Sequence, residues 1–143
     1  MENMEFKTRA LVIKVHRDDI VEILPNKAWT EADTLEIAEE NVAAMKKAVG
    51  GKIRGLLSNT SNTYLSKDVL NCYSTADIGE VATAMLTTSF GSKIVGNLFL
   101  KITGKSKVTD GKRGNAPVKI FNEKDRDEAV MWLLEQIKKH KNS

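Results

Sequence analysis

The sequence predicts one α/β domain with a mixed sheet of about five strands and about four covering helices. Apolar, β-branched runs alternate along the chain with segments of helical periodicity. The length of 143 residues is that of one domain with its own core. A hydrophobic fraction of 41% with 29% charged residues is typical of a folded globular protein. We therefore expect a single domain over residues 1–143, in the order β-β-α-β-α-β-α-β-α.

The first half of the chain predicts a hairpin followed by a helix. Residues 11–15 and 20–24 are apolar runs separated by a short polar stretch, which indicates two strands joined by a tight turn. Thr30 has the character of an N-cap, so a helix is expected from about Glu31. Its apolar residues recur at spacings of three and four until Gly50-Gly51 ends it.

The second half continues the alternation of strands and helices. Ser66 is a natural N-cap for a short helix. Asn122 is expected to cap the final helix, and a glycine- and lysine-rich stretch is expected to be an exposed loop. The predicted strands are 53–57, 81–88 and 117–121, the predicted helices are 67–73, 90–102 and 123–139, and the loop is 103–116.

Composition limits the function and location. The net charge is +3, but basic and acidic residues are interleaved, and the more basic stretches 101–113 and 138–141 lack aromatic residues for stacking on bases. We therefore expect no nucleic-acid binding. The sequence contains no run of about 20 apolar residues, so no membrane span is predicted. The single Cys72 fits a reducing compartment, so we expect a cytoplasmic protein.

Motifs of known chemistry are incomplete in this sequence. His16-Arg17-Asp18 has three letters of a kinase catalytic loop, but Ile23 replaces the required Asn, so a hairpin turn is the better interpretation. The stretch 91–96 has the glycine spacing of a P-loop, but Asn97 replaces its Lys. Cys72 is expected to be a small core residue. We expect no enzymatic activity, no metal and no cofactor.

The predicted helix 90–102 is apolar around more than half of its circumference, which exceeds what one buried face requires. Its apolar surface could pack into the domain's own core, against a second copy in a homodimer, or against a small apolar ligand. The residues of this ligand or dimer face are Phe90, Ile94, Leu98, Phe99 and Ile102. In the loop that follows, Lys105, Lys112 and Arg113 are candidate contacts for an anion.

Several stretches taken together resemble a known family. They are the opening hairpin, 53–57, 66–68, 84–87, 92–100 and the ending 118–133. This combination, which covers nearly the whole chain, resembles uncharacterised bacterial STAS-like (SpoIIAA-like) domains, which are related to anti-sigma-factor antagonists. The resemblance implies a SpoIIAA-like fold and a non-enzymatic regulatory or protein-interaction module.

The resemblance also implies a switch residue and two kinds of partner. Anti-sigma-factor antagonists carry a phosphorylated serine in an Asp-Ser-Ser-Gly-like motif, and Ser66 matches it in position and residue type. Leu65 stands in place of the Asp, and the Gly is absent. The implied partner is a protein kinase or regulator. Relatives with the CRAL-TRIO fold carry lipids under a movable helix, which implies, as the alternative, a carrier of small hydrophobic ligands with a pocket under helix 90–102.

Overall fold

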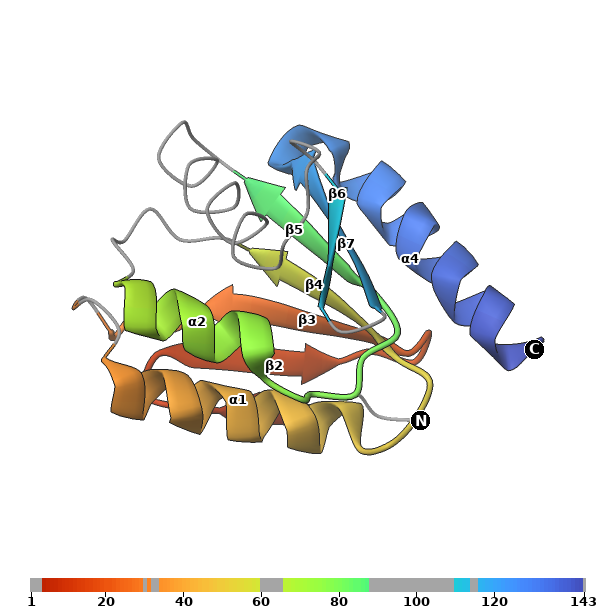
Figure 1. Cartoon of the computed structure of the whole chain (residues 1–143). Coiled ribbons are helices and arrows are strands. Elements are labelled where there is room, and N and C mark those ends of the chain that lie inside the picture. The colour runs from red at the N-terminus through yellow and green to blue at the C-terminus, as the bar shows by residue number, and fades with distance from the viewer. Residues whose placement is uncertain are drawn as a thin grey trace.

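The computed structural model describes residues 4–29, 31, 34–59, 66–87, 110–113 and 116–142. These residues form one mixed sheet with helices on both faces (Figure 1). The predicted α/β class is therefore confirmed. The predicted helix 90–102, with its five apolar candidate residues, lies outside the described residues.

Within the described residues the sheet has seven strands in the order β1-β2-β3-β4-β5-β7-β6. Strands β3, β4, β5 and β7 are parallel to one another, whereas β1 and β2 at one edge and β6 at the other run antiparallel to their neighbours. The bounds are β1 Met4–Lys7, β2 Leu11–Val15, β3 Ile20–Pro25, β4 Gly55–Asn59, β5 Thr83–Thr87, β6 Asp110–Arg113 and β7 Ala116–Asn122.

The sheet has more strands than the five predicted, because the pattern of apolar residues did not predict the two edge strands β1 and β6. Strand β1 has only four residues, which is too short for a clear alternation, and it pairs through its backbone with β2. Strand β6 lies inside the stretch 103–116 that was predicted to be an exposed loop, so that prediction is wrong at residues 110–113. Its glycine and lysine content suggested a loop, but its backbone pairs with β7.

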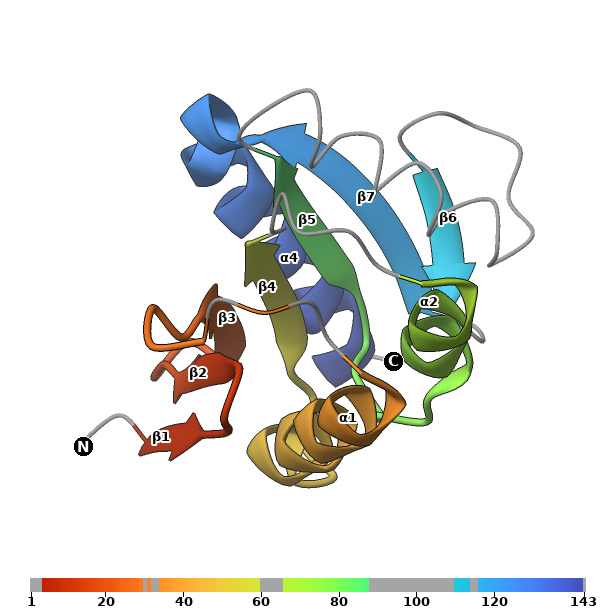
Figure 2. The same ribbon diagram turned by 90° about the vertical axis from the view of Figure 1, so that its left-hand side faces the viewer.

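Helices α1 (Leu35–Val49) and α2 (Lys67–Thr75) lie on one face of the sheet, and α4 (Arg126–Lys141) lies on the other. Figure 2 shows this layering from the side. The 3-10 turn η1 (Glu123–Asp125) leads from β7 into α4. Along β4, Leu56 joins the cluster under α1 and the next residue, Leu57, joins the cluster under α4, so the two faces share one strand.

The helix caps correct two sequence predictions and confirm a third. Helix α1 begins at Leu35 rather than at about Glu31, and its cap is Thr34, whose hydroxyl accepts the Ile37 N–H at 3.2 Å. Asn122 caps η1 by accepting the Lys124 N–H and does not cap α4 itself. Ser66 caps α2 as predicted.

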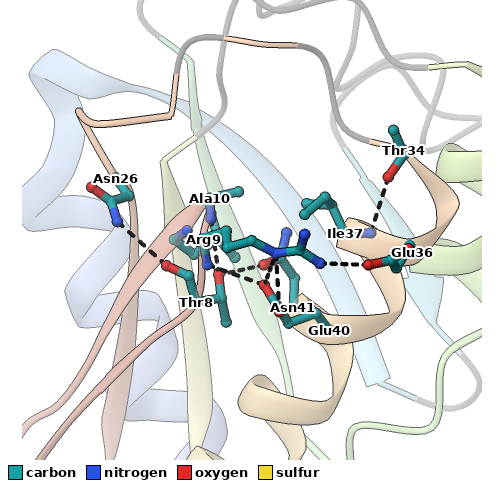
Figure 3. A network of polar contacts seen from close by, with 10 residues as sticks. Thr8, Arg9, Ala10, Asn26, Thr34, Glu36, Ile37, Glu40 and Asn41 are labelled. Carbon is teal, nitrogen blue, oxygen red and sulfur yellow. Dashed lines mark hydrogen bonds and ion pairs between the residues drawn. The ribbon is translucent and has the colours of Figure 1, made fainter.

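A polar network ties α1 to the turn between β1 and β2 (Figure 3). Asn41 is completely buried, and its Oδ1 accepts a hydrogen bond from the Thr8 hydroxyl at 2.6 Å. Its Nδ2 donates to the hydroxyl of Tyr73 in α2 at 2.9 Å. On the exposed side, Arg9 pairs with Glu36 and Glu40. The buried amide of Asn41 thus joins α1, α2 and the turn between β1 and β2. Both ends of the amide have a partner, as a buried polar group requires.

Candidate functional site

Ser66 lies at the N-terminus of α2, the helix that follows the central parallel strand β4. Its backbone is extended, and its Oγ accepts the Val69 N–H at 3.3 Å. Ser66 is half-buried, while Lys67 and Asp68 beside it are exposed. The Ser66 hydroxyl therefore caps α2. Because the residue is only half-buried, a partner can approach it.

The other predicted contact residues are placed in part. Phe90, Ile94, Leu98, Phe99, Ile102 and Lys105 lie outside the described residues. Lys112 and Arg113 lie in β6, where they stand opposite Pro117 and Ala116 of β7. Contact of these cations with an anion stays a prediction.

Cys72 lies on α2 and is half-buried. Burial, together with the negative charge of Glu39, raises the pKa of its thiol above the ordinary value. The thiol is therefore protonated at neutral pH, and a protonated thiol is a poor nucleophile. Cys72 belongs to neither apolar cluster of the described residues, so it is not the fully buried core residue that the sequence predicted.

An open cleft of about 510 Å³ lies between α4 and the hairpin of β2 and β3. Its apolar residues come from three elements: Ile20 from β3, Leu57 from β4 and Val130 from α4. Its polar lining residues are His16, Arg17 and Asp18 of the hairpin turn and Arg126 of α4. The turn was correctly predicted from sequence, but its place beside a cleft was not.

Glu22 joins the two sides of this cleft. Its side chain is only 12% exposed, and each carboxylate oxygen has a partner. Oε1 lies 3.0 Å from His16 Nε2, and Oε2 accepts a hydrogen bond from an Arg126 guanidinium nitrogen at 2.7 Å. The carboxylate therefore fixes an imidazole and a guanidinium at the same cleft. Residues 22 and 126 are 104 positions apart, and no local motif signals this contact.

Asp19, in the same turn, anchors the far end of α4. Its backbone has a positive φ of 69°. Its carboxylate pairs with Arg54 at 3.4 Å and with Lys141 at 2.6 Å. Burial acts to raise the pKa of this carboxyl, but the hydrogen bonds and charges of Lys141 and Arg54 outweigh burial, and the pKa lies below its ordinary value. The C-terminal end of α4 is thus attached to the turn, whereas its N-terminal end is attached to Glu22 of β3.

Within the described part of the chain, no helix has both the length and the apolar composition needed to cross a membrane. The same residues contain no group of three or more His, Cys, Asp and Glu side chains placed to hold a metal ion.

Comparisons with protein-family models, with curated proteins and with solved structures found no match. What the described residues define is the class: an α/β domain built on a mixed sheet.

Proposed function

We propose that this chain is a non-enzymatic regulatory module of the STAS-like type, which binds a protein partner and is controlled by phosphorylation of Ser66. The observation that carries the proposal is the position of Ser66 as the cap of α2, the helix that follows the central parallel strand β4 in the chain. This is the position at which the resemblance puts the switch serine.

The order of the strands supports the SpoIIAA-like part of the proposal. Strands β3, β4 and β5 lie side by side in chain order, and β7 follows them in the same direction. Helix α1 connects β3 to β4, and α2 connects β4 to β5, both on the same face (Figure 1). Parallel strands joined in chain order by crossover helices on one face are consistent with the fold that the resemblance implies.

A phosphate on Ser66 would change the surface at a defined point. It adds roughly two negative charges beside free N–H groups of a helix N-terminus, which stabilise anions. The neighbouring Lys67 is exposed and adds a positive charge. The modified helix start can therefore remain folded while it gains about two negative charges, and a partner that contacts α2 can distinguish the two states.

The proposal is tested by affinity purification of the tagged protein from its own cells, comparing wild type, Ser66→Ala and Ser66→Asp. Thr34→Asp is the matched control, since Thr34 caps α1 by the same bond that Ser66 makes in α2. We expect a stoichiometric protein partner whose recovery changes with Ser66→Asp and not with Thr34→Asp. Intact-mass analysis should show a phosphorylated wild-type fraction that Ser66→Ala lacks.

If partner recovery is the same for all variants and the wild type carries no phosphate, the proposed switch is wrong. A partner that is lost equally with Thr34→Asp would also contradict it, because the effect would then follow from any acidic cap and not from this position.

A carrier of small apolar ligands is the second candidate, and one observation favours it. Met85 of β5 and its neighbour Ile120 of β7 lie on the α1 and α2 face of the sheet, as does Val118. These three side chains belong to neither of the two apolar clusters that the described residues form. All three are buried, and β5 ends at Thr87, shortly before the predicted helix 90–102 in the sequence.

The carrier is tested by native mass spectrometry of the purified protein beside its denatured mass. A carried ligand adds mass only in the native spectrum and appears in an organic extract. Equal masses with an empty extract would reject the carrier.

A further inference from the structure

We propose that the cleft between α4 and the β2–β3 hairpin is a binding site for a small organic acid, namely a carboxylate with a short apolar chain. Helix α4, which forms one side of the cleft, lies on the face of the sheet opposite α2 (Figures 1 and 2). The site is therefore separate from Ser66, the cap of α2.

The base of the cleft is rigid and apolar. Ile20 and Leu57 close it from below, but they are 3% and 1% exposed, so both are parts of the core under α4 and leave little of their own surface to a ligand. Val130 adds a half-buried apolar side chain from the helix. The volume of about 510 Å³ falls within the usual range for small-molecule sites.

The carboxylate would be held by Arg126. A guanidinium group carries five N–H donors in a planar fork that matches a carboxylate. Arg126 uses one nitrogen for Glu22, and its side chain remains 45% exposed. Because Glu22 is only 12% exposed, its hydrogen bond holds one end of the guanidinium group at the cleft before a ligand arrives. Such preorganisation reduces the entropic cost of binding.

His16 is held in the same way, and its position gives the ligand a second polar neighbour. Its Nε2 is engaged by Glu22, which sets the orientation of the ring at the edge of the cleft. The ring nitrogen that does not face Glu22 is a further hydrogen-bonding group. One half-buried carboxylate thus orients both groups that would meet the ligand.

The balance of charge limits the ligand to a low charge. The residues that line the cleft include two arginines and one aspartate, and Glu22 lies beside them. A single carboxylate suits this balance better than a polyphosphate. An amine is disfavoured because Asp18, the acid at the rim, already accepts the Ile20 N–H and stands beside Arg17.

The test is an NMR titration with hexanoate, 1-hexanol and hexylammonium, three probes with the same apolar chain. The chain has two histidines, so the ring signals are readily assigned, and His140 in the last turn of α4 is an internal reference. We expect hexanoate to move the His16 signals to saturation and leave those of His140 in place. Hexanol and hexylammonium should bind at least about tenfold more weakly, since they lose a charge-assisted hydrogen bond.

Variants locate the site. Arg126→Met retains an aliphatic side chain without the fork and should weaken hexanoate binding at least about tenfold, and Arg126→Lys, which keeps the charge, should also weaken it. Lys124→Met, which removes a nearby exposed cation, and Ser66→Asp should leave the affinity unchanged. A backbone amide spectrum of each variant verifies that it is folded.

The proposal is overturned if hexanoate gives no saturable shift of His16, if hexanol binds as well as hexanoate, or if folded Arg126→Met and Arg126→Lys both retain wild-type affinity. Because Ser66→Asp is expected to have no effect here, failure of this site and failure of the regulatory switch are separate results.

Discussion

At the scale of single residues, the buried Asn41 joins α1 to the turn between β1 and β2 and to α2. We predict that Asn41→Ala lowers the free energy of unfolding by about 2–4 kcal/mol, because it leaves the half-buried Thr8 and Tyr73 hydroxyls without this partner. Urea denaturation followed by circular dichroism measures the change. Glu39→Ala, at an exposed position of the same helix, should change stability by less than about 0.5 kcal/mol. Equal effects of the two variants would show that the network adds nothing to stability.

Gly55 is a second position where one residue controls packing. A Cβ added there would lie 3.0 Å from Leu133 Cδ2 of α4. We predict that Gly55→Ala destabilises the protein by about 1–3 kcal/mol through overpacking. In a background of Leu133→Val, which shortens the opposing side chain, the same change should cost clearly less. A double-mutant cycle by urea denaturation checks this, and full additivity of the two changes would exclude the contact as the cause.

At the scale of elements, the end of α4 is attached to the β2–β3 turn by Asp19. Since the pKa of Asp19 is lowered in the folded protein, the ionised carboxylate favours folding at any pH above its unfolded value. That contribution is lost as the pH falls through the lowered folded value. Asp19→Asn keeps a residue that tolerates the positive φ and removes only the charge.

We therefore predict that Asp19→Asn costs about 0.5–1.5 kcal/mol at pH 7 and that the difference from wild type shrinks as the pH falls below about 4. Unfolding curves in urea at several pH values measure it. Lys141→Met should reproduce part of the loss, whereas Lys139→Met, two positions earlier on the same exposed end, should not. A difference between wild type and Asp19→Asn that does not vary with pH would contradict the assignment.

At the scale of the whole molecule, both apolar clusters depend on the same strand. Leu56 faces α1 and Leu57 faces α4, and each is 1% exposed. We predict that the domain unfolds as one cooperative unit and that Leu56→Ala and Leu57→Ala each cost about 2–5 kcal/mol. Native-state hydrogen exchange should give α1 and α4 amides the same highest free energy of opening, in wild type and in both variants. Separate values for the two helices would mean that the faces fold independently.

The sequence alone determined the class of the fold and most of its inner elements. Apolar periodicity located β2, β3, β4, β5, β7 and three helices to within a few residues, since these segments bury one or both faces. The preference of Ser and Thr for N-cap positions predicted the Ser66 cap of α2 correctly. The same preference predicted Thr30 as the cap of α1, but the cap is Thr34. The edge strands β1 and β6 were missed because backbone pairing, which leaves little side-chain pattern, builds them.

Only the tertiary structure decided the strand order and the cleft. Strand β7 lies between β5 and β6 because long-range pairing selects neighbours that chain order does not. Glu22 meets His16 six residues away and Arg126 104 residues away. From the sequence alone, Glu22, His16 and Arg126 each look like an ordinary polar residue on the surface. Their meeting depends on how α4 crosses the sheet, and that crossing is set by the packing of Leu133 and its neighbours on the strands below.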